Sequence, residues 1–160
     1  MKILVFTEGT ITVHSHAAGH SREEIIQQSL NRDTNGLGAD IEDYKNYILL
    51  GNPVEKLQSW KNQGAEIIYM TSRTELEEIN QVRETLEKYN LPDRQNLFFR
   101  QNGESYSQAA ERIMPDILIE DDCESIGGEK EMVYPHIKEE LKSKIKSVII
   151  KEFEGIDNLP

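Results

Sequence analysis

Ile117-Leu118-Ile119-Glu120-Asp121-Asp122 is a short apolar run that ends in three consecutive carboxylates. Pro115-Asp116 introduces the run and Gly127-Gly128 follows it, a pattern that predicts a buried parallel strand over 116–120. The carboxyl end of this strand would deliver its acids to one place. Like charges repel at such short range, so these acids persist together when they are solvated, partly protonated, or neutralised by a cation such as Mg²⁺.

The composition narrows the classes of protein to which the chain can belong. A chain of 160 residues is expected to form one domain. Its 18 Lys and Arg residues face 29 Asp and Glu residues, and the net charge of -11 would repel a nucleic acid. The chain has one cysteine, no signal-peptide pattern and no apolar stretch of the roughly 18 residues that cross a membrane. We therefore expect a cytoplasmic protein that binds neither nucleic acid nor membranes.

Apolar runs with strand character alternate with segments of helical period. Strands are predicted at 3–6, 66–70, 97–99, 116–120 and 147–150, helices at 21–30, 53–63, 74–89 and 104–114, and a polar loop at 31–40. Capping boxes are expected at Ser21–Glu24 and Thr74–Glu77, and Leu76 is expected to begin the apolar stripe of its helix. This rhythm predicts an α/β three-layer sandwich with a central parallel sheet.

Polar side chains follow four of the predicted strands. These segments are Thr7-Glu8-Gly9-Thr10, Thr71-Ser72-Arg73, Arg100-Gln101-Asn102 and Glu120-Asp121-Asp122. In open α/β sheets, ligands bind outside the carboxyl ends of the strands. Carboxylates suit Mg²⁺, while hydroxyls and guanidinium groups suit phosphoryl oxygens. The sequence therefore predicts a pocket for a metal ion and a small phosphorylated molecule.

Three of these regions resemble the motifs of a known family. The stretches 5–11, 69–73 and 118–122, in this order and at these separations, resemble motifs I, II and IV of the haloacid dehalogenase-like (HAD) superfamily. The resemblance covers most of the chain and implies a Rossmann-type fold, Mg²⁺, and a phosphatase-type hydrolase activity. Residues 12–52 are short for a cap domain, so we expect a single domain over 1–160 with at most a small helical lid.

Motif I departs from the family pattern where the chemistry is done. The pattern Asp-x-Asp-Gly-Thr implies a nucleophilic first Asp and a second Asp that acts as acid and base. When the chain is aligned on Gly9, these positions hold Phe6 and Glu8. Phenylalanine cannot attack phosphorus, so the phospho-aspartate route is closed at Phe6. A slip of one residue would place Thr7 there, and this hydroxyl would need an adjacent base. Glu8 remains as the candidate acid/base, or as an occupant of the vacated metal position.

The resemblance also indicates which residues would bind phosphate. Motif II implies that Thr71 supplies the phosphate-binding hydroxyl, with Ser72 and Arg73 beside it. In the family, a lysine called motif III precedes the fourth strand and neutralises the phosphate, but no such lysine is evident between the strands predicted at 97–99 and 116–120. Arg100 is the candidate substitute, because a guanidinium can hold phosphate at two points. The alternative is that 71–73 merely leads into the helix that follows.

Motif IV implies that Asp121 and Asp122 bind the metal, with Glu8 as a further candidate ligand. The site is expected to be weaker than in the family, because the motif I carboxylate is absent. The alternative is that these acids are solvated loop residues. Cys123 lies beside them and is not expected to be a nucleophile, because their charge raises a thiol pKa.

His14, His16 and His20 have no closed zinc-site spacing, and we interpret them as part of a polar loop near the mouth of the site. Three functions are compatible with the sequence. The chain is an Mg²⁺-dependent phosphohydrolase of altered mechanism, a binding or regulatory protein that retains the phosphate pocket without turnover, or an interaction module whose acidic face binds a basic partner.

Overall fold

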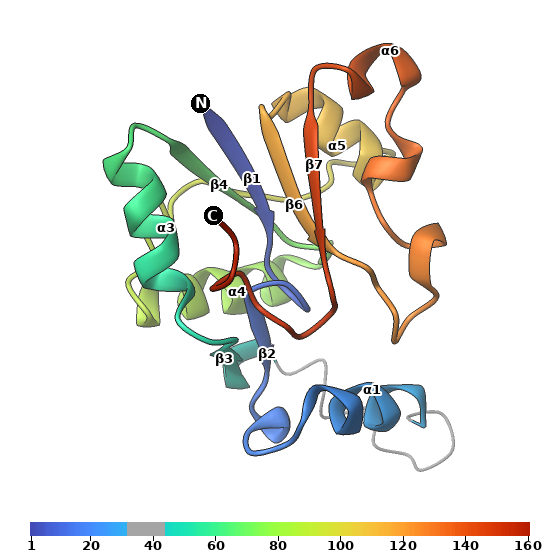
Figure 1. The fold of residues 1–160 in the computed structure, drawn as a ribbon. Coiled ribbons are helices and arrows are strands. Elements are labelled where there is room, and N and C mark those ends of the chain that lie inside the picture. Colours follow the sequence, from blue (N-terminus) through green and yellow to red (C-terminus); the bar gives the residue numbers. More distant parts are fainter. Residues whose placement is uncertain (32–43) are drawn as a thin grey trace.

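The apolar runs pair as the parallel strands of one sheet in the computed structural model, which describes residues 1–31 and 44–160 (Figure 1). The strand order is β5-β4-β1-β6-β7. The bounds are β1 Lys2–Phe6, β4 Glu66–Met70, β5 Leu97–Phe98, β6 Ile117–Asp121 and β7 Lys146–Ile150. All five predicted strands are found within one or two residues of their predicted ends. Most of the polar loop predicted at 31–40 lies outside the described residues.

Helices cover both faces of the sheet, so the predicted three-layer α/β sandwich is confirmed. Successive strand side chains point to opposite faces, and Ile3 and Val5 therefore join one core cluster while Leu4 joins the other. The first cluster contains residues of α3 (Pro53–Asn62) and α4 (Leu76–Lys88), and the second contains residues of α5 (Tyr106–Ile113). Figure 1 shows α3 and α5 on either side of the strands.

The capping box of α1 (Arg22–Leu30) is confirmed. Ser21 Oγ accepts from the Glu24 amide at 3.2 Å, and the Glu24 carboxylate accepts from the Ser21 amide at 2.7 Å. The box predicted at Thr74 is wrong, because α4 begins one residue later, with Glu75 at the N-cap and no side chain capping it. Leu76 then falls in a first turn that faces solvent and is 69% exposed, so it does not belong to the apolar stripe.

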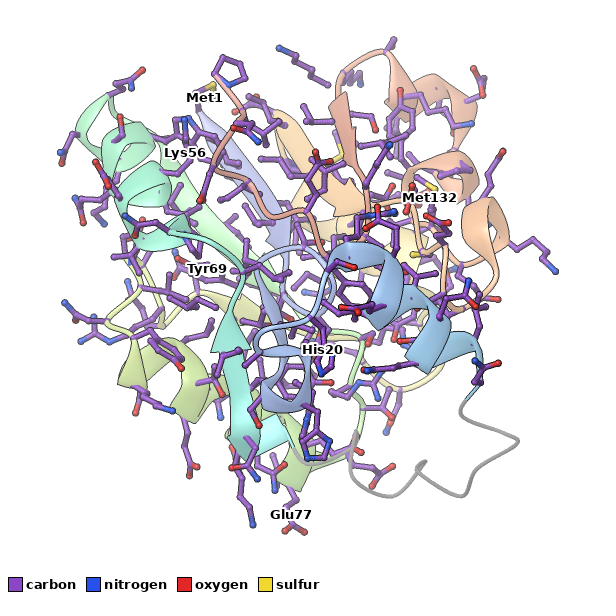
Figure 2. All side chains as sticks on the ribbon, turned by 60° about the horizontal axis from the view of Figure 1, so that its bottom comes forward. Met1, His20, Lys56, Tyr69, Glu77 and Met132 are labelled. Carbon is purple, nitrogen blue, oxygen red and sulfur yellow. The ribbon has the colours of Figure 1, made fainter. Side chains whose placement is uncertain are left out.

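A small second sheet lies beyond the carboxyl ends of the main strands. In it, β2 (Thr12–His14) pairs antiparallel with β3 (Tyr47–Leu49), and α1 packs against this pair through Ile25. Where a small helical lid was expected, the described residues thus hold two strands as well as a helix. Strands of three residues are too short to show an alternating pattern. In Figure 2, which brings this end of the molecule forward, α1 lies in front of the main sheet, with His20 near its start.

The remaining elements are short. Among the described residues, the helical turns are η1 Ser15–Ala17, η3 Tyr44–Asn46, η4 Gly128–Lys130 and η5 Tyr134–His136, and α6 Glu139–Lys142 is a single turn. Within the residues that the structure describes, no helix has the length and apolar character needed to span a membrane.

Candidate functional site at the carboxyl edge of the sheet

Glu8 joins the ends of β1 and β4. Its Oε2 accepts from Thr7 Oγ1 at 2.7 Å, and its Oε1 accepts from Thr71 Oγ1 at 2.6 Å. Both threonines are fully buried. Because β1 and β4 are parallel neighbours, the residues that follow them lie side by side. The motif I and motif II segments therefore meet, with both carboxylate oxygens of Glu8 engaged by hydroxyl groups.

Asp121 joins the end of β6 to the same turn after β1. Its Oδ2 accepts from Thr10 Oγ1 at 2.8 Å, and its Oδ1 accepts from the Cys123 amide at 3.0 Å. Gly9 makes the close approach possible, because its φ is +81° and a Cβ there would lie 2.8 Å from Asp121 Oδ2. The motif I and motif IV segments thus share one edge of the sheet.

Three carboxylates gather at this edge. Asp121, Asp122 and Glu152 each offer an oxygen within 4.8 Å of the others. Burial raises the pKa of Asp121 and of Glu152, and the charges of Asp121 and Asp122 raise the pKa of Glu152 further. A bound cation would relieve this repulsion. Glu8, which the sequence also indicated as a ligand, is not a member of this group of acids and accepts from Thr7 and Thr71 instead.

Glu152 was missed by the sequence reasoning, although it lies only two residues after β7. Its carboxylate accepts from the Ser125 amide at 2.6 Å and from Ser125 Oγ at 2.7 Å. Its own amide donates to Asp122 Oδ1 at 3.0 Å. The available signal was similar to the one that identified Asp121, an acid close to the carboxyl end of an apolar strand.

Glu120 does not join this group, so the expectation that three consecutive acids converge is wrong for this residue. Its side chain points to the opposite face of β6 from that of Asp121, as alternation along a strand requires. There the carboxylate accepts from the amides of Val133 and Tyr134 at 2.6 and 2.8 Å. Glu120 therefore holds the loop after β6 and lies outside the acidic cluster.

Glu120 makes the stability of the chain depend on pH. Burial raises its pKa from 4.5 to about 7, against the two backbone hydrogen bonds that lower it. A raised folded-state pKa means that the folded chain holds the proton more tightly, so this contribution to stability is complete below about pH 4.5 and is lost as the pH rises through about 7. Urea unfolding at a series of pH values measures the free energy of unfolding. As the pH rises, this free energy should fall more steeply for the wild-type chain than for Glu120→Gln, with a difference in slope that corresponds to at most one bound proton. Parallel profiles would contradict this prediction.

The candidate phosphate ligands form a second group at the same edge, after β4 and β5. Arg73 donates from Nε and Nη2 to Ser72 Oγ at 3.1 and 2.6 Å, and its amide donates to Thr71 Oγ1 at 3.2 Å. Tyr106 donates its hydroxyl to the Ser72 carbonyl. The Arg100 guanidinium carbon lies 4.0 Å from the centroid of the Tyr106 ring. Tyr106 was placed in a helix by the sequence reasoning, which assigned no role to its ring.

The histidines lie outside these contacts, and Cys123 takes part through its hydrogen bonds to Asp121. His14 belongs to β2 and is buried, with the His16 ring 4.4 Å from its own, whereas His20 is exposed and pairs with Glu24 at 3.5 Å. Among the described residues, the group that could hold a metal contains no histidine. Burial, followed by the charge of Asp121, raises the pKa of the Cys123 thiol far above its usual range, which agrees with an unreactive thiol.

No protein-family model and no curated protein sequence matches this chain. Several solved structures do match this chain. A Class C acid phosphatase from Bacillus anthracis aligns with a TM-score of 0.60 and 12% identity over 96% of this chain and 67% of that chain. The structure of the same phosphatase with tungstate bound aligns with a TM-score of 0.59 and 12% identity over 96% of this chain and 68% of that chain. A HAD family hydrolase from Deinococcus radiodurans aligns with a TM-score of 0.49 and 9% identity over 92% of this chain and 79% of that chain. The likeness to the phosphatase, together with the parallel sheet, shows that the fold is HAD-like.

Proposed function

We propose that this chain binds Mg²⁺ and a small phosphorylated molecule at the carboxyl edge of its sheet, and that it does so without forming a phospho-aspartate. The observation that supports this proposal is the meeting of Asp121, Asp122 and Glu152 within 4.8 Å, at the edge where the hydroxyl and guanidinium groups also gather. The phosphatase of the same fold is described with tungstate bound, and tungstate is a mimic of phosphate.

The acidic cluster suits a hard cation. Its ligands are all oxygens, as Mg²⁺ prefers, and each ionised carboxylate retains lone pairs beyond those that its present hydrogen bonds use. Glu152 supplies a third carboxylate, which offsets the carboxylate that motif I lacks at Phe6. Bound Mg²⁺ would contribute positive charge that attracts phosphoryl oxygens, and Asp121 would be held in place by Thr10.

The absence of a nucleophile at Phe6 favours binding over turnover. Phe6 is a partly buried side chain that packs against the core cluster on the α5 side of the sheet. It offers no atom that could take a phosphoryl group, and the loss of a nucleophile costs several orders of magnitude in rate. The polar groups that follow β1 and β4 remain suited to an anion.

Hydrolysis by an altered mechanism is the second candidate, and one contact favours it. Thr7 Oγ1 donates to Glu8 Oε2 at 2.7 Å, which is the arrangement of a hydroxyl beside a base. Glu8 could equally activate a water. Against a nucleophilic role, Thr7 is fully buried and its hydroxyl also lies 3.2 Å from the Met70 carbonyl. In this second candidate, Glu8 is the acid/base.

Calorimetry tests the proposal directly. The chain is titrated with MgCl₂ and then, in saturating Mg²⁺, with tungstate and inorganic phosphate, and release of phosphate from an aryl phosphate is followed in parallel. We expect Mg²⁺ to bind, the anions to bind more tightly when Mg²⁺ is present, and phosphate release to remain at background. Glu152→Gln should weaken Mg²⁺ binding, whereas Glu129→Gln, which removes an exposed acid, should not.

Two results would change the conclusion. Metal-dependent phosphate release that Glu8→Gln abolishes would establish the second candidate. A titration without heat, and with no shift of the thermal midpoint at any Mg²⁺ concentration, would eliminate the proposal.

A further inference from the structure

Arg100 is a basic residue that forms no ion pair within the part of the chain that the structure describes, although the protein is acidic. None of the ion pairs formed among residues 1–31 and 44–160 includes it. Its Nε is buried and has no hydrogen-bond partner within the described residues. A buried donor without a hydrogen-bond partner is costly and rare, so such a donor calls for an explanation.

The guanidinium of Arg100 is held in a defined place. It stacks on the Tyr106 ring at 4.0 Å, and the Tyr106 hydroxyl is anchored by the Ser72 carbonyl. Stacking leaves the in-plane donors of a guanidinium available, and it reduces the freedom that an anion would otherwise have to remove on binding. Arg100 is therefore oriented before any ligand arrives.

Arg73 adds a second guanidinium to the same cluster. It is anchored on the Ser72 hydroxyl, and the carbonyl of the same residue accepts from the hydroxyl of Tyr106, the residue on whose ring Arg100 stacks. Two guanidinium groups close to one tyrosine make this cluster the natural place for a negatively charged group.

Arg100 and Thr71 have different partners. The Thr71 hydroxyl donates to Glu8, in the turn after β1, whereas the Arg100 guanidinium lies on the ring of Tyr106, whose hydroxyl donates to the Ser72 carbonyl. Because the Arg100 Nε has no partner within the described residues, the stacked guanidinium can bind a group other than a phosphate held beside Thr71.

We propose that Arg100, stacked on Tyr106 and supported by Arg73, binds a second anionic group of the ligand, so that the ligand class is a phosphate ester that also carries a carboxylate or a second phosphate. This inference rests on the proposed function, because it takes the first phosphate to lie beside the metal.

A pair of nearly isosteric probes tests the inference. Phosphoglycolate carries a carboxylate where ethyl phosphate carries a methyl group. Both are titrated by calorimetry into the full chain in saturating Mg²⁺, and methylene bisphosphonate, which carries two phosphonate groups, serves as a third probe. We expect phosphoglycolate or the bisphosphonate to bind at least about tenfold more tightly than ethyl phosphate, which is the size of one charge-assisted hydrogen bond.

Variants assign the effect to Arg100. Arg100→Gln should remove the preference for phosphoglycolate and the bisphosphonate over ethyl phosphate, and Arg100→Lys should restore this preference only in part, since an ammonium group lacks the planar fork. Arg94→Gln removes an equal charge from an exposed residue and should keep the full preference. Equal affinities for all three probes in the wild-type chain would overturn this inference while the proposed function stands. Failure of all three probes and of inorganic phosphate to bind would overturn both.

Discussion

Asp121→Asn is expected to weaken Mg²⁺ binding by at least about 100-fold, since the loss of even an outer-shell partner of a metal site commonly costs 10–100-fold. Asp121 links two parts of the site. It accepts from Thr10, in the turn after β1, and it belongs to the acidic cluster of Asp121, Asp122 and Glu152. An amide keeps the shape of the side chain but removes the charge that the cation requires. Calorimetric titration with MgCl₂ measures the change.

Asp116→Asn is the matched control for this substitution. Asp116 precedes β6 at the opposite edge of the sheet, where its carboxylate accepts from the Lys2 amide at 2.6 Å. The control removes the same charge at the other end of β6 from Asp121, and should leave Mg²⁺ affinity within about twofold. Both variants should keep the wild-type circular dichroism spectrum. Unchanged affinity in Asp121→Asn would show that Asp121 does not bind the cation.

The sequence was sufficient to place the motif segments at one edge, because that placement follows from local pattern and from simple geometry. Apolar runs of about five residues identify buried strands, and parallel strands bring the residues after them to the same edge. The contacts of Glu8 with Thr71 and of Thr10 with Asp121 are consequences of this rule. The prediction required no knowledge of side-chain packing.

The parts that the sequence did not supply depend on direction and on distance along the chain. Glu120 and Asp121 are neighbours with opposite orientations, and the acids alone do not say which of the two faces the core. Glu152 comes from the far end of the chain and joins the cluster only because β7 lies beside β6. The stacking of Tyr106 on Arg100 likewise requires the packing of α5 against the sheet. Each of these needed the tertiary arrangement.

Gly9→Ala is expected to destabilise the chain by about 3 kcal/mol and to weaken Mg²⁺ binding as well. Two costs add in this estimate. An alanine at a φ of +81° costs about 1 kcal/mol, and its Cβ would lie 2.8 Å from Asp121 Oδ2, which forces the carboxylate away from Thr10 and leaves a buried hydrogen bond broken. Urea unfolding measures the first effect, and calorimetry with MgCl₂ measures the second.

Gly19→Ala separates the two costs. Gly19 has nearly the same backbone conformation, with a φ of +80°, but a Cβ there would meet nothing within 4 Å. This variant should lose only the conformational part, about 1 kcal/mol, and should bind Mg²⁺ as the wild-type chain does. The difference between the variants, about 2 kcal/mol, then measures the contact between the turn after β1 and Asp121. Equal losses in the two variants would mean that this contact contributes nothing, and that the closeness of Gly9 to Asp121 does not position the carboxylate.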